Sequence, residues 1–137
     1  MFAFDHEPSS TFYSMRSRLI ACLVCALVLG GCDRIRETKL TGNWRCETAD
    51  GVEEFSFQPD HSFRCSNTYK KVVVQPSVVE ETGTWRVSGN KLVLDSITTW
   101  SKQRTKISRK LGRLAKDTVV IKSADGMTDL SYDRTSR

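Results

Sequence analysis

The sequence has no apolar run long enough to cross a bilayer as a helix. The uncharged stretch LIACLVCALVLGG, residues 19–31, would be roughly 20 Å long at about 1.5 Å per residue. The hydrocarbon core of a bilayer is about 30 Å thick, so this stretch is too short for a transmembrane helix. A buried core helix usually has a polar stripe, and this run has none. We interpret it as the apolar region of a signal peptide, which Arg16 and Arg18 precede.

Histidine is scarce, and only His61 lies beyond residue 31. We find no nucleophile beside a base and no phosphate-binding loop, and the acids next to one another in the sequence would point to opposite faces of a strand. The acids that cluster in the sequence are Glu53, Glu54, Asp60, Glu80 and Glu81. The sequence therefore predicts no enzyme activity, no metal site and no cofactor.

The apolar run ends in LGGC, residues 29–32, which resembles the lipobox of bacterial lipoproteins. In that family the peptide is cut just before the cysteine, which is then acylated. The resemblance implies that Leu29, Gly30 and Gly31 are recognition residues and that Cys32 is the lipidated first residue of the mature chain. Asp33, which follows, resembles the signal that keeps lipoproteins of enteric bacteria in the inner membrane. The choice between inner and outer membrane stays open.

Residues 1–14 are polar and acidic, unlike the start of a signal peptide, whereas a start at Met15 would give a signal of ordinary form. We expect a signal peptide at 1–31, a lipidated tether at 32–40, one domain at 41–134 and a tail at 135–137. The protein would be anchored in the cell envelope and face the periplasm. Nucleic acid is therefore excluded as a partner.

Beyond residue 41, short apolar alternations are separated by turn residues every 8–12 positions. Gly89 and Asn90 tolerate positive φ and predict a tight hairpin. This pattern predicts an all-β protein, an antiparallel up-and-down meander barrel of about eight strands. Residues 101–116 are ambiguous, because Ile107, Leu111 and Leu114 have helical spacing. We favour a strand around 103–108 there.

The first predicted strand, GNW, resembles the start of lipocalin-like barrels, which begin with Gly-x-Trp. The resemblance covers residues 40–134 and includes GTWRVSGNKLVL at 83–94. It implies that Gly42 and Trp44 close one end of the barrel and that Arg134 stacks across Trp44. Lipocalins are longer and have a large loop over a ligand cavity, whereas the turns here are short. Side chains can fill so small an interior, and those expected there are Phe55, Phe57, Phe63, Trp85, Leu92, Leu94 and Ile121.

Two thiols, Cys46 and Cys65, remain after maturation in an oxidising compartment, which favours a disulfide. A simple meander register separates them by two strands, roughly 10 Å, which is too far for a bridge. Whether they are bridged or are two buried thiols stays open.

A basic run follows Asp95, with no acid before Asp117. A run of one charge is usually a solvated face, but it could also contact an anionic envelope surface or an acidic protein partner. Its residues are Lys102, Arg104, Lys106, Arg109, Lys110, Arg113 and Lys116.

These observations predict a lipid-anchored periplasmic barrel that acts as a non-catalytic interaction or structural module of the cell envelope. The alternative is a carrier or sensor that holds a small lipophilic ligand inside the barrel. The two hypotheses differ in whether the interior is filled.

Overall fold

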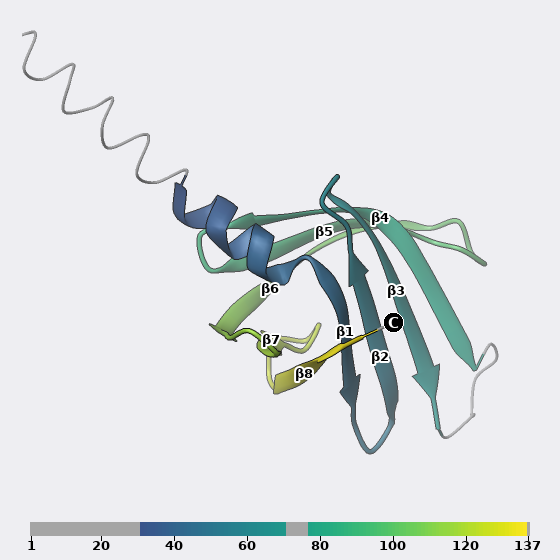
Figure 1. The fold of residues 1–137 in the computed structure, drawn as a ribbon. Helices are drawn as coiled ribbons and strands as arrows, with labels where there is room; N and C mark the ends of the chain where they lie inside the picture. The colour runs from purple at the N-terminus through teal and green to yellow at the C-terminus, as the bar shows by residue number, and fades with distance from the viewer. Residues whose placement is uncertain (1–30, 71–76, 137) are drawn as a thin grey trace, which may run out of the picture. The chain divides into compact units, whose positions relative to one another are not determined.

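The computed structural model describes residues 31–70 and 77–136. Within them a helix covers residues 31–40 and eight strands follow. The strands are β1 (Gly42–Glu47), β2 (Gly51–Phe57), β3 (Ser62–Tyr69), β4 (Val78–Ser88), β5 (Lys91–Thr98), β6 (Arg104–Leu114), β7 (Thr118–Lys122) and β8 (Asp129–Thr135). Each strand pairs antiparallel with the next, and β8 pairs with β1, so the sheet is a closed barrel (Figure 1).

The all-β, up-and-down barrel predicted from the sequence is confirmed. The ambiguous segment 101–116 contains strand β6, which pairs with β5 along its first half and with β7 near its end. The predicted signal peptide lies outside the described residues except for Gly31. No helix among the described residues is long and apolar enough to span a membrane.

The barrel has two different ends. We call the end with the helix and the turns 58–61, 89–90 and 115–117 the closed end. We call the end with the turns 48–50, 99–103 and 123–128 the open end. Strands β1, β3, β5 and β7 run from the closed end to the open end, and the other four run back.

Aromatic side chains fill the interior near the closed end. The Phe57 ring lies 5.1 Å from both the Phe55 and the Trp85 ring centroids, and Phe57 is 1% exposed. Burying one such side chain contributes about 1.5–3 kcal/mol. All seven residues that the sequence placed in the interior are buried: Phe55, Phe57, Phe63, Trp85, Leu92, Leu94 and Ile121.

Residues 33–40, expected to be a tether, are instead helical and lie against the closed end. Leu40 is fully buried in the core. The Val87 and Gly89 amides each donate to a helix carboxylate, Glu37 Oε1 at 3.0 Å and Asp33 Oδ1 at 3.1 Å. The two acids are four residues apart on the helix, about 6 Å, and the two amides are two residues apart, about 6.6 Å. Because the two spacings match, the helix carboxylates can accept hydrogen bonds from backbone amides at the end of β4, which extends beyond its pairing with β3.

Candidate functional site

The open half of the interior contains a buried ionic cluster that the sequence analysis did not anticipate. The Arg109 side chain is 3% exposed, and its Nη1 lies 2.9 Å from Glu53 Oε1. Arg109 Nη2 donates to the Tyr132 hydroxyl at 2.8 Å, and Nε donates to the Lys122 carbonyl oxygen at 2.7 Å. The Tyr132 hydroxyl in turn donates to Glu53. Each polar group in the cluster therefore has a partner, which is the condition for burying charge in a barrel.

The electrostatics of this cluster favour a structural role over a chemical one. Burial raises the pKa of Tyr132, and the neighbouring Glu53 carboxylate raises it further. Burial alone would lower the pKa of Arg109, but Glu53 and Tyr132 outweigh it, so this pKa rises. Arg109 thus stays charged and Tyr132 stays neutral at physiological pH. Neither can exchange a proton readily, as general acid–base catalysis requires.

Cys46 and Cys65 lie on either side of β2. Cys46 is opposite Glu53, and Cys65 is opposite Phe55, so one whole strand separates the two thiols. Both are buried and free in this structure. Burial is the main reason why the pKa of each thiol is raised, and the Glu53 carboxylate adds to it. Thiols with raised pKa values are poor nucleophiles and poor metal ligands. Among the described residues no group of three or more His, Cys, Asp or Glu could hold a metal ion.

Placing Arg109 on a basic surface was wrong. Arg109 follows Ile107 and precedes Leu111 at two-residue spacing, and Leu111 is buried as well. In a strand such residues share one face, so Arg109 points inward. The same alternation places Glu53 in phase with Phe55 and Phe57. The other six residues of the basic run are exposed: Lys102, Arg104, Lys106, Lys110, Arg113 and Lys116.

The closed end has the contact that the lipocalin-like resemblance implies. The Arg134 guanidinium lies over the Trp44 ring, 4.2 Å from its centroid. Its nitrogens also donate to the carbonyl oxygens of Thr41 and Lys39, at 2.9 and 2.7 Å. Gly42 has φ +131°, and a Cβ there would overlap Arg134 Nη1. Position 42 therefore favours glycine, because its φ is positive and because Arg134 packs directly against it.

Of the residues expected at the cleavage and lipidation site, Leu29 and Gly30 lie outside the described residues. Cys32 is an exposed free thiol in the helical segment. Asp33, the proposed sorting residue, accepts the Gly89 amide hydrogen bond described above.

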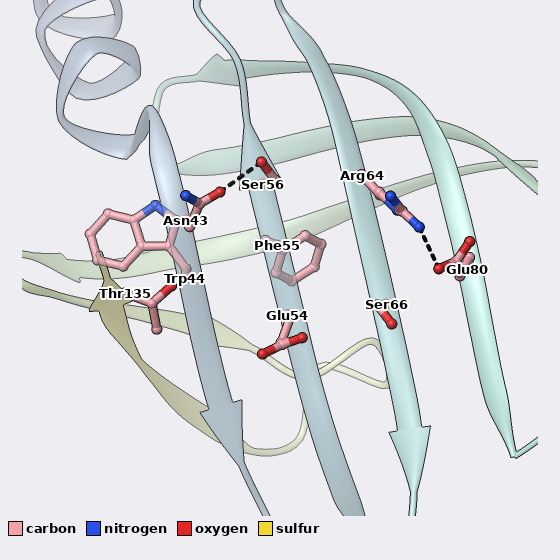
Figure 2. Close-up of a pocket in the computed structure, with 9 residues that line it drawn as sticks. All are labelled: Asn43, Trp44, Glu54, Phe55, Ser56, Arg64, Ser66, Glu80 and Thr135. Atoms are coloured by element: carbon pink, nitrogen blue, oxygen red, sulfur yellow. Dashed lines mark hydrogen bonds and ion pairs between the residues drawn. The ribbon is translucent and has the colours of Figure 1, made fainter. Parts of the chain in front are cut away.

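A polar hollow of about 370 Å³ lies outside the barrel over β1–β4 (Figure 2). Its side chains bond one another across the strands. Ser56 donates to Asn43 Oδ1 at 2.8 Å, and Arg64 forms an ion pair with Glu80. Its charged side chains are neutralised in pairs, since Glu54 also pairs with Arg45, so the hollow offers no unpaired charge to a ligand.

A small hollow of about 120 Å³ lies at the open mouth, with Glu53, Asn67 and Leu130 among its lining residues. Pockets that hold drug-sized ligands measure about 300–1,000 Å³. This hollow is well below that range, so it is too small for a drug-sized ligand.

The comparisons with known proteins identify no family. No family model matches the chain, and no curated protein matches it. One similar solved structure is the crystal structure of the Cpx pathway activator NlpE from Escherichia coli, with 17% sequence identity and a TM-score of 0.43. The match covers 72% of this chain and 47% of that one, so the chain spans about half the length of that protein. A likeness at this level supports no statement about function.

Proposed function

We propose that the protein is a lipid-anchored, non-catalytic module of the bacterial cell envelope that acts through the outer surface of its barrel. The observation that carries the proposal is the filled interior. Aromatic side chains occupy the closed half, and the Glu53–Arg109–Tyr132 cluster occupies the open half. A carrier of lipophilic molecules needs an apolar cavity. An apolar ligand beside the ionic cluster in the open half would raise the free-energy cost of burying its charges.

The proposed lipid anchor rests on the lipobox and on the apolar run before it, because residues 29–32 are LGGC. The helix supports a particular arrangement of the anchored protein. Asp33 accepts a hydrogen bond from the Gly89 amide, so an acylated Cys32, the residue before it, would lie next to the barrel. The closed end would then lie at the membrane surface, and the open end would face away from it.

Metabolic labelling with an alkyne analogue of palmitate tests the anchor. The wild-type chain should be labelled and should fractionate with membranes, and Cys32→Ser should lose both properties. Cys25→Ser is the matched control, because it removes a cysteine of the predicted signal peptide and should leave labelling intact. Equal labelling of the Cys32→Ser variant would contradict the anchor.

Native mass spectrometry of the protein isolated from cells tests whether the barrel carries a ligand. After detergent removal, the measured mass should correspond to the acylated polypeptide alone. A non-covalent, stoichiometric small-molecule adduct would contradict the proposal and favour a carrier or sensor.

A further inference from the structure

Strand β6 is much longer than the neighbour that should cover it. β6 has 11 residues and β7 has 5. The register of the pair runs only from Leu111 opposite Ile121 to Leu114 opposite Val119. Beyond Lys122 the chain closes into its own turn, where the Ser123 amide donates to the Thr128 carbonyl oxygen at 2.7 Å. Residues 104–109 therefore have a strand partner on the β5 side and none on the β7 side among the described residues.

The backbone groups on this uncovered side can be assigned from two hydrogen bonds. The Leu111 amide donates to the Asn90 carbonyl oxygen at 2.7 Å, and the Thr98 amide donates to the Gln103 carbonyl oxygen at 3.0 Å. The odd-numbered residues of β6 thus point their backbone groups at β5, and in an antiparallel strand the even-numbered residues point away from it. The N–H and C=O groups of residues 104, 106 and 108 form a free edge, which lies beyond the end of β7.

Positive charge surrounds this edge. Lys106 and Lys110 are exposed, and neither forms an ion pair with a described acid. Arg104 is neutralised, because its Nε and Nη2 each lie 2.9 Å from an oxygen of Asp95. Lys102 is exposed in the turn before β6. An edge with unpaired lysines repels another basic edge and attracts an acidic one.

A hollow of about 570 Å³ lies beside the edge, between Ser108–Lys110 and the 122–126 segment. Its one acid, Asp125, is already engaged in its own turn, where it accepts hydrogen bonds from the Ser123 hydroxyl and from the Met127 amide. Lys122 is paired with Asp129 at 2.8 Å. Space for a chain and unpaired positive charge are therefore found together at the free edge.

We propose that an extended acidic segment of a partner protein binds here by adding a strand to β6. This inference rests on the proposed function as an interaction module and names the surface and the chemistry of the partner. The N–H and C=O groups of residues 104, 106 and 108 would form the new ladder, as in other strand additions. The side chains of these residues and of Lys110 point outward, so the partner would carry acids at every second position.

The same geometry disfavours the other occupants of such an edge. Pairing with β6 of a second copy would bring Lys106 and Lys110 of both chains together, and like charges on adjacent strands are destabilising. Anionic headgroups would neutralise the lysines but would leave the backbone donors of the edge without a regular partner. An acidic strand would neutralise the lysines and would also form hydrogen bonds with the N–H and C=O groups of the edge.

The test uses the protein isolated from cells and fluorescent nine-residue peptides that alternate glutamate and valine. Fluorescence anisotropy should show saturable binding of the glutamate–valine peptide. The lysine–valine peptide should not bind. A glutamate–valine peptide N-methylated on every second residue, on the face that pairs with β6, should bind at least about tenfold more weakly, since it keeps its charge and loses its ladder.

Variants of the edge separate charge from backbone. Lys106→Glu should weaken peptide binding about tenfold or more, whereas Lys39→Glu, the same charge change on the helix, should leave it within about twofold. Ser108→Pro removes an edge N–H that β5 does not use, so it should weaken binding while the fold persists. Because a proline variant can fail to fold, Lys106→Glu and the N-methylated peptide test the proposal independently.

Amide signals in an NMR titration locate the bound peptide. The amides of Arg104, Lys106 and Ser108 should become protected from exchange when the peptide binds. Equal binding of the N-methylated peptide, or binding that shifts signals elsewhere, would overturn strand addition. Binding to vesicles of phosphatidylglycerol without binding to the peptide, or concentration-dependent dimers lost in Ser108→Pro, would overturn it in favour of a membrane or a second copy. None of these outcomes depends on acylation or on whether the barrel holds a ligand, so they are separate from the tests of the proposed function.

Discussion

The closed and open ends of the barrel use their side chains in opposite ways. At the closed end, Leu40, Trp44 and Phe57 are buried, and the helix covers the end of β4. At the open end the interior is ionic, and apolar side chains point outward, with Trp100 64% and Met127 84% exposed. The first half of β6 pairs with β5 there but has no strand partner on its β7 side among the described residues. We infer that stability is concentrated at the closed end and that the surface available to a partner lies towards the open end.

The largest loss of stability should follow from removing an aromatic ring at the closed end. Phe57→Ala should lower the free energy of unfolding by about 3–5 kcal/mol, because neighbouring rings cannot collapse fully into the space. Urea unfolding followed by tryptophan fluorescence measures this loss. Ile35→Ala, at an exposed helix position, is the control and should change stability by less than about 0.5 kcal/mol. Similar losses in the two variants would mean that burial at the closed end does not determine the contribution of a side chain to stability.

In the open half, Glu53→Ala should cost about 3 kcal/mol, because it leaves the buried Arg109 without its counter-ion. Combining Glu53→Leu with Arg109→Leu should cost less than Glu53→Ala alone, since both charges are then removed. Urea unfolding of Glu53→Leu, Arg109→Leu and the double variant measures the coupling between the two residues. Additive losses would show that the ion pair contributes little to the open half.

Much of this arrangement was predictable because period-two alternation determines which face of a strand is buried. The barrel and its seven predicted interior residues followed from that pattern. Arg109 was misplaced because its charge was read as a sign of exposure, although its phase with Ile107 and Leu111 pointed inward. The sequence could not reveal that Glu53, Arg109 and Tyr132 meet, since their contact depends on the closure of distant strands.

The helical conformation of residues 33–40 was not predicted for a different reason. Its residues are charged, which suggested a solvated tether. Asp33 and Glu37 accept hydrogen bonds from backbone amides at the end of β4. These amides are available because the pairing of β3 with β4 ends before them, which only the three-dimensional structure shows. The free edge of β6 likewise depends on the unequal lengths of two paired strands.

Alkaline pH should destabilise the open half through Cys65. Burial raises the pKa of this thiol above that of an unfolded cysteine, about 8.5. Above that pH the unfolded chain loses its proton while the folded chain keeps it, so stability falls as pH rises, by up to about 1.4 kcal/mol per pH unit. Urea unfolding at pH 7.5, 8.5 and 9.5 measures the slope. In Cys65→Ser the free energy of unfolding should depend less steeply on pH. An unchanged slope would mean that Cys65 does not cause the pH dependence.

The smallest of these losses should come from the contact between the helix and β4. Glu37→Ala removes the acceptor of the Val87 amide and the partner of His61, whose Nε2 lies 3.1 Å from Glu37 Oε2. We expect a loss of about 1 kcal/mol, because water can reach part of this contact. Urea unfolding measures the loss, and hydrogen exchange should show faster exchange of the Val87 amide. Thr38→Ala, an exposed helix position, is the matched control.

Residue-resolved hydrogen exchange of the free protein, followed by NMR, tests most directly whether the two regions differ. We predict the slowest exchange in the strands at the closed end and an alternation along the first half of β6. There the amides of Thr105, Ile107 and Arg109 should be protected, and those of Arg104, Lys106 and Ser108 should exchange rapidly. Uniform protection of residues 104–109 would contradict the account, because it would mean that β6 has no free edge to offer a partner.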